Sequence, residues 1–261
     1  MRWGRRAPAT GNPAGTRTQG DPPSANGASS FHLFWDLAHP EPLCEVSAVL
    51  TVLDPPPARL YFWALQAGFY DGDRSLGAAH LGLQWHPSYP GSTAVNWGGY
   101  DAGGTVLGGS GSALPGALGD RNTRDYPWVV GRPYRLRIHA PPAPAGSWRG
   151  EVTDLSTGTA VVVRDLYPGG THLAGPVVWA EVFARCDHPA VGARWSELSA
   201  RTLAGGTVGP ESLVANFQRF DDGGCDNTDI RVEGDAVVQV TNTPRRTPQG
   251  ARIHLPSPAP P

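Results

Sequence analysis

The sequence predicts an all-β protein, a two-sheet antiparallel sandwich of the jelly-roll kind. The 261 residues include 34 Gly and 27 Pro, and only 17% of them are charged. Short runs with strand composition recur roughly every ten to twenty residues, separated by turn residues, which is typical of sandwiches. No segment has apolar residues at helical spacing over the length that a helix needs. The length fits one large β core.

Three segments follow from composition. Residues 1–28 are rich in Pro, Gly and Thr and poor in aliphatic residues, so we predict a disordered N-terminal arm. Residues 29–205 form the predicted sandwich core, which begins at Phe31–Trp35. Residues 206–261 are predicted to add two or three strands that either complete the sandwich or pack on it as an appendage. The predicted core strands are 45–53, 59–70, 79–86, 93–100, 134–139, 148–154, 160–166, 176–186 and 193–203.

Composition also excludes several functions. The chain has no Lys, which removes the P-loop lysine, Schiff-base chemistry and Ser/Lys dyads. The net charge is -2, and there is no basic cluster beyond Arg2, Arg5 and Arg6, so no nucleic-acid partner is expected. No run reaches the roughly 18–20 apolar residues of a membrane span. The first thirty residues lack a signal-peptide core, which makes a cytoplasmic location the default. Secretion is the alternative if the start lies further upstream, and the oligomeric state stays open.

The three cysteines leave at least one thiol unpaired. We expect Cys186 to pair with Cys225 and Cys44 to stay free. Buried free thiols in a reducing compartment are an equal alternative, and no C-x-x-C spacing indicates zinc.

Alternation along the strands predicts a polar face with aromatic rings. In 176–186 the small apolar residues alternate with Trp179, Glu181 and Arg185, and in 79–86 the apolar residues alternate with His80, Gln84 and His86. A carboxylate within such an apolar strand needs a partner, and Arg185 could supply one. Flat rings that stack on sugars, beside amides and charged groups, suit a carbohydrate. An ordinary wet sheet face with Trp in the core is the competing interpretation. The predicted ligand-binding residues are Gln66, Gln84, Asn96, Trp97, Tyr126, Trp128, Trp179, Glu181 and Arg185.

Three other motifs are candidates for a binding or metal site. The segment 120–128, rich in Arg, Asn and aromatic residues, is predicted to fold over the sheet as a binding loop, with a surface loop pinned by Arg–Asp pairs as the alternative. His80 and His86 lack a third metal ligand. The acidic loop that includes Asp226 and Asp229 misses the EF-hand spacing, so no cofactor is predicted and calcium is the weaker alternative.

Several motifs resemble a bacterial family of unknown function called DUF3472. They are YFWALQ at 61–66, AHLGLQW at 79–85, NWGGY at 96–100, YRLRIH at 134–139 and WAEVFAR at 179–185. The resemblance spans residues 60 to about 203, over half of the chain. It implies no assigned activity, although some members look like extracellular proteins in glycan-handling contexts. The strand order is also similar to concanavalin A-like lectins and glucanases, but the E-x-D-x-E run of the glucanases is absent.

These observations lead to three hypotheses. The first is non-catalytic binding of a glycan or polysaccharide across the polar face, closed over by Tyr126 and Trp128. The second is a polysaccharide-active hydrolase or lyase in which Glu181 is the acid or base and Asp125 or Asp101 is the second carboxylate. The third is a structural or protein-interaction sandwich without a small ligand.

Overall fold

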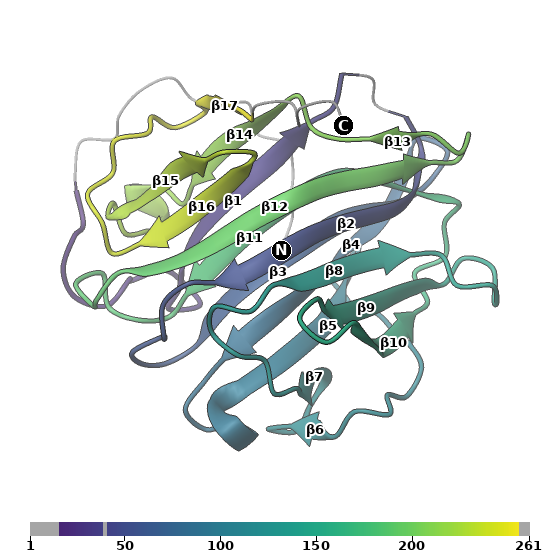
Figure 1. Cartoon of the computed structure of the whole chain (residues 1–261), viewed down its shortest axis with the longest axis horizontal. Helices are drawn as coiled ribbons and strands as arrows, with labels where there is room; N and C mark the ends of the chain where they lie inside the picture. The colour runs from purple at the N-terminus through teal and green to yellow at the C-terminus, as the bar shows by residue number, and fades with distance from the viewer. Residues whose placement is uncertain (1–15, 39–40, 256–261) are drawn as a thin grey trace.

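The computed structural model describes residues 16–38 and 41–255, and it is all-β (Figure 1). The strands lie in two series of antiparallel neighbours, joined by one pairing between Leu173 and Leu43. The first series, here the upper sheet, runs β17 (Arg252–His254), β14 (Ser212–Phe217), β1 (Ser29–Asp36), β11 (His172–Val182), β3 (Tyr61–Asp71), β4 (Arg74–Trp85), β5 (Thr93–Asp101), β7 (Asp120–Asp125) and β6 (Gly116–Ala117).

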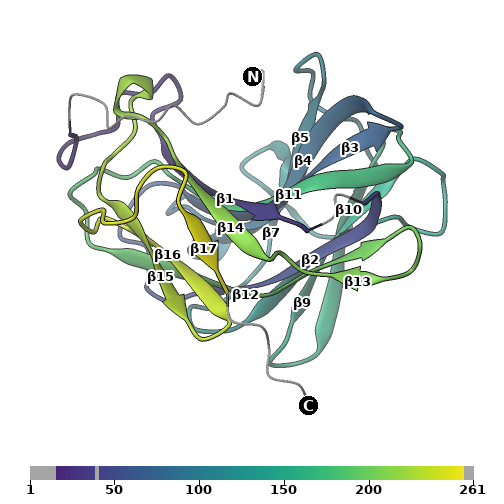
Figure 2. The ribbon, with the colours of Figure 1, turned by 90° about the horizontal axis from the view of Figure 1, so that it is seen from above.

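The second series is the lower sheet. It runs β15 (Thr228–Glu233), β16 (Ala236–Thr241), β12 (Val191–Thr202), β2 (Leu43–Val52), β8 (Tyr134–His139), β9 (Trp148–Asp154) and β10 (Thr159–Leu166), with β13 (Thr207–Val208) also paired to β12. In Figure 2, β1, β11, β3, β4 and β5 lie above β2, β12 and β9. A large curled antiparallel sheet with two layers is therefore confirmed, whereas the jelly-roll, concanavalin A-like assignment stays a prediction.

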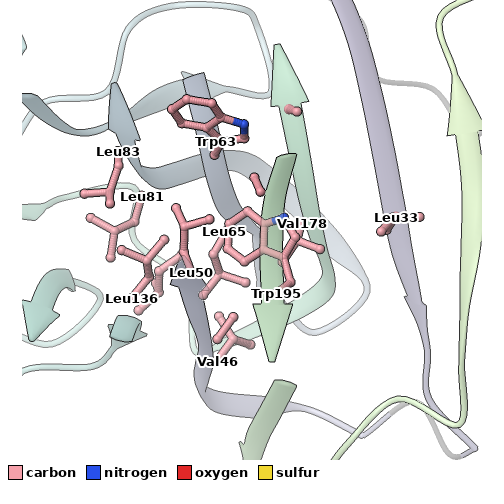
Figure 3. Packing of buried hydrophobic residues seen from close by; sticks show 14 of the residues in the cluster. Leu33, Val46, Leu50, Trp63, Leu65, Leu81, Leu83, Leu136, Val178 and Trp195 are labelled. Carbon is pink, nitrogen blue, oxygen red and sulfur yellow. The ribbon is translucent and has the colours of Figure 1, made fainter. Parts of the chain in front are cut away.

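The core lies between the layers, and alternation decides which side chains enter it. Odd-numbered residues of β3, such as Trp63 and Leu65, point inward and are fully buried. They meet Leu50 and Trp195 from the lower sheet (Figure 3). Even-numbered residues of β3 therefore face outward.

A polar side chain connects the two sheets inside this core. Gln239 of β16 is fully buried; its Oε1 accepts from Trp195 Nε1 at 2.8 Å and its Nε2 donates to the Phe31 carbonyl of β1 at 2.9 Å. Buried amides are tolerated when their groups are paired in this way.

Two helical segments, η1 (Pro90–Ser92) and η2 (Phe220–Asp222), are short 3-10 turns. None of the helices in the described part of the chain is long and apolar enough to span a membrane.

Residues 16–28 lie against the protein, although composition assigned them to the arm. The Arg17 amide donates to Asp226 Oδ2 at 2.7 Å, and its guanidinium donates to the carbonyls of Phe220 and Gly224. The carbonyl of Gly20 accepts from the Cys186 amide at 2.8 Å. The contacts are made by backbone and polar groups, which a composition argument based on apolar content does not detect. The first half of the predicted arm, residues 1–15, lies outside the described residues.

Cys186 and Cys225, the pair expected from the sequence, are joined by a disulfide bond. Cys44 is a free, half-buried thiol. The disulfide connects the loop after β11 to the loop before β15, close to the point where residues 16–28 are held.

Candidate active site

The outward face of β1, β11, β3, β4 and β5, here the site face, is organised in three rows of neighbouring residues. The first row is Phe34, Val177, Gln66, His80 and Gly98. The second row is His32, Trp179, Ala64, Gly82, Asn96 and Thr123. The third row is Ser30, Glu181, Phe62, Gln84, Ala94 and Asp125. Successive rows are about 6.6 Å apart along the strands, because alternate residues share a face.

Five of the nine predicted binding residues share this face. They are Gln66, Gln84, Asn96, Trp179 and Glu181.

Three of the other predicted residues lie in the core. Trp97 is fully buried, and the rings of Tyr126 and Trp128 are nearly so. Trp128 packs edge-on against Trp63, and its Nε1 donates to the Gln84 carbonyl at 2.9 Å. The prediction that 120–128 is a binding loop is therefore wrong: residues 120–125 form strand β7, and the aromatic residues that follow fill the hydrophobic core. Apolar burial of large rings outweighed the polar composition of the segment.

Arg185 lies beyond the end of β11 and does not pair with Glu181. Its guanidinium makes two hydrogen bonds of 3.0 Å to the Asp187 carboxylate at the exposed surface. The prediction that Arg185 pairs with Glu181 is therefore wrong. The carboxylate instead accepts a 2.9 Å hydrogen bond at Oε1 from Nδ2 of Asn26.

Glu181 is half-buried among uncharged groups. Its neighbours across the sheet are Ser30 on β1 and Phe62 on β3. Burial raises the pKa of the Glu181 carboxyl, and the hydrogen bond from Asn26 opposes that rise. A half-buried carboxyl with a raised pKa is a candidate proton donor and acceptor.

Trp179 occupies the centre of the site face beside Glu181. Its ring meets Phe62 edge-on at 4.8 Å between centroids and His80 at 5.5 Å. Trp179 Nε1 donates to Gln66 Oε1 at 3.1 Å. Because that bond occupies the amide oxygen, Nε2 is the end of Gln66 that can donate to a ligand.

The site face also carries two histidines, and burial lowers the pKa of both His32 and His80 to about 4. Both imidazoles are therefore neutral near pH 7. We call Glu181, Asn26, Trp179, Gln66 and His80 the Glu181 site.

Gln84 and Asn96 belong to a separate polar network. Gln84 Oε1 accepts from the Tyr89 hydroxyl at 2.9 Å, and Asn96 Nδ2 donates to Thr123 Oγ1 at 2.9 Å. Thr123 Oγ1 also donates to Asp120 Oδ2 at 2.6 Å. Both amides are buried, so this network serves the structure of β4, β5 and β7.

The two carboxylates proposed as partners of Glu181 are remote from it. Asp125 lies in the same row but four strands away, roughly 19 Å at standard strand spacing. Asp101 accepts hydrogen bonds from the amides of Gly103 and Thr105, which close a turn.

Within residues 16–38 and 41–255, no group of three or more His, Cys, Asp or Glu is placed to hold a metal ion. In the acidic loop, Asp226 accepts from Arg17 and Arg245, and Asp229 accepts from the amides of Arg246 and Thr247.

Sequence reasoning missed Asn26 and understated His80. Asn26 falls in the segment assigned to the arm, although Asn-Gly at 26–27, directly before a strand, is a turn signal. The aromatic spacing around Phe62 and Trp179 was visible, but which rings meet depends on strand pairing.

Comparisons with known proteins give no family. No family model and no curated protein matches the chain. Among solved structures, a Scytalido-glutamic peptidase with a peptide-based transition state analog is 13% identical, with a TM-score of 0.45, and covers 81% of this chain and 97% of that chain. SCP-B, an eqolisin-family peptidase in complex with a tripeptide, is 13% identical, with a TM-score of 0.43 and the same coverage. A bacteriophage tailspike enzymatically active domain is 15% identical, with a TM-score of 0.35, over 83% of this chain and 30% of that chain.

The predicted non-catalytic carbohydrate-binding function is corrected. Trp97, Tyr126 and Trp128, which were to stack on a sugar or close over it, lie in the core, so they cannot form a sugar-binding surface.

Proposed function

We propose that this protein is a hydrolase that cleaves peptide bonds and that Glu181 is its acid–base group. The observation that carries the proposal is the half-buried carboxyl of Glu181, which is held by the amide of Asn26 and has a raised pKa. An Arg partner would favour the charged form of a carboxylate, whereas burial among uncharged groups favours the protonated form of Glu181.

The number of carboxyl groups favours peptide over glycoside cleavage. Glycosidases of the common kind use two carboxyl groups about 5–10 Å apart. Asp125 is roughly twice that distance from Glu181. Burial raises the pKa of Glu181, and the hydrogen bond from Asn26 opposes that rise. Hydrolysis of a peptide bond by water needs only one acid–base group to move the protons.

The proposed reaction uses Glu181 twice. The carboxylate takes a proton from a water molecule while the water oxygen bonds to the carbonyl carbon of the substrate. The resulting carboxylic acid then gives that proton to the leaving nitrogen as the C–N bond breaks. Glu181 returns to its carboxylate form, and one water is consumed for each acid and amine released.

The rows suggest how a peptide would lie. Gln66 is two rows from Glu181, about 13 Å along the strands, which is four residues of an extended chain. An extended peptide parallel to β3 would therefore present one carbonyl to Gln66 Nε2 while another bond lies at Glu181. Ala64 and Gly82 lie between Trp179 and Asn96 and leave little side-chain volume in the middle of the face.

The test is peptide hydrolysis by the wild type, Glu181→Gln and Glu197→Gln. Glu197 is an exposed carboxylate paired with Arg135 on the lower sheet, so it is a matched control. Cleavage of a peptide library would be followed by mass spectrometry between pH 3 and pH 8, a span of about five units around the usual carboxyl range. Glu181→Gln should reduce kcat/KM by about 100- to 10,000-fold, the usual contribution of acid–base catalysis. Full activity of Glu181→Gln, or no cleavage by the wild type, would contradict the proposal.

A further inference from the structure

We propose that Asn26 is a positioning residue for Glu181 and that the N-terminal segment 16–28 is therefore part of the active site. This inference rests on the proposed function of Glu181 and extends it to the N-terminal segment. The contact is specific: Nδ2 of Asn26 donates to Oε1 of Glu181 at 2.9 Å across 155 residues of sequence.

The Asn26 side chain can present only its nitrogen to Glu181. Its Oδ1 accepts from the Ala28 amide at 3.2 Å, and it lies 3.1 Å from the Ser24 hydroxyl, whose single proton also has the Ala28 carbonyl within 2.5 Å. Because the Ala28 amide donates to the oxygen, the Asn26 amide cannot turn over without losing that bond. The nitrogen thus orients one carboxylate oxygen and leaves Oε2 to handle the water.

The segment that carries Asn26 is fixed at several points. Arg17 is bonded to Asp226 and to carbonyls near Phe220, and its guanidinium lies 4.4 Å from the centre of the Phe220 ring. The Gly20 carbonyl is bonded to the amide of Cys186, so the disulfide loop holds the segment. Ala28, two residues after Asn26, is fully buried. These contacts hold the segment in place, so that Asn26, which is itself exposed, is kept beside Glu181.

Asn26 is the side chain that hydrogen-bonds to Glu181, and the groups around them differ from it in kind. The neighbouring positions on β1 and β3 carry Ser30 and Phe62. The titratable groups in the three rows of the site face, besides Glu181, are His32, His80 and Asp125. Burial lowers the pKa of both histidines to about 4, which keeps them neutral above about pH 5. Asp125 lies four strands away from Glu181. Asp36, at the far end of β1, is paired with Arg252.

Asn26→Asp is the sharpest variant because it keeps the oxygen that accepts from the Ala28 amide. It replaces the donor with a second carboxylate oxygen facing Glu181, so the two groups must share a proton and the pKa of Glu181 rises. Asn26→Ala removes the donor without adding a charge, which gives a smaller rise. Asn242→Asp is the matched control, because Asn242 donates to the Arg185 carbonyl and not to Glu181.

The experiment is a pH titration of the Glu181 carboxyl carbon by NMR in protein labelled with ¹³C-glutamate, with the signal assigned by its loss in Glu181→Gln. We expect upward shifts of about one pH unit in Asn26→Ala and about two in Asn26→Asp, with none in Asn242→Asp. The acidic limb of the kcat/KM profile should move by the same amounts.

An unchanged Glu181 titration in Asn26→Asp would overturn the proposal. If Asn26→Ala does not fold, Asn26→Asp still decides the question, since it keeps the turn. If the wild type cleaves no peptide, the proposed function fails, but the titration still tests the role of Asn26.

Discussion

Replacement of Gln239 by Leu tests whether a buried amide holds the two sheets together. Gln239 accepts from Trp195 Nε1 and donates to the carbonyl of Phe31, and both bonds are fully buried. Leucine has a similar size but can make neither bond, so the indole N–H and the carbonyl each lose a partner. An unsatisfied buried group costs about 1–3 kcal/mol, and the gain from an apolar side chain offsets part of the sum.

We therefore expect Gln239→Leu to lower the free energy of unfolding by about 3 kcal/mol. For a protein of this size that corresponds to a fall in Tm of about 6–12 °C. Urea unfolding followed by tryptophan fluorescence and circular dichroism would measure the change. A double-mutant cycle with Trp195→Phe isolates the bond to the indole, and a coupling energy of about 1–2 kcal/mol is expected. A loss below about 1 kcal/mol for Gln239→Leu would refute the reasoning.

Two further predictions concern the disulfide and the histidines. Replacing Cys186 and Cys225 with Ser opens a loop of 39 residues. By loop entropy, this should lower the free energy of unfolding by about 4 kcal/mol. Thermal melts would show a lower Tm for the double variant than for the wild type, and equal Tm values would contradict this prediction. The pKa of His32 and of His80 is about 4 when folded, below the ordinary 6.5. The unfolded chain therefore binds more protons between these values, and stability present above pH 6.5 is lost as the pH falls toward 4. In urea unfolding, the free energy of unfolding should fall less between pH 7 and pH 5 in His80→Gln than in the wild type. An equal fall in the two proteins would show that His80 does not contribute to the pH dependence of stability.

Much of the site face could be predicted from alternation alone. The spacing in 176–186 and 79–86 placed Trp179 and Glu181 opposite the core, and His80 and Gln84 likewise, because side-chain period in a strand is fixed at two. The all-β class followed from the same patterns. The neighbours of β11 could not be predicted, because pairing with β1 and β3 joins segments more than a hundred residues apart.

Tertiary structure decided the partners of the chemical groups. The sequence by itself determined that Glu181 lies on an outward face and needs a partner. It could not choose between Arg185, four residues away, and Asn26, in a segment whose composition indicates disorder. Likewise, Trp97, Tyr126 and Trp128 have the composition of a binding surface, but their large apolar area is buried between the sheets. Composition and period are local properties, whereas burial and hydrogen-bond partners depend on which distant segments the fold brings together.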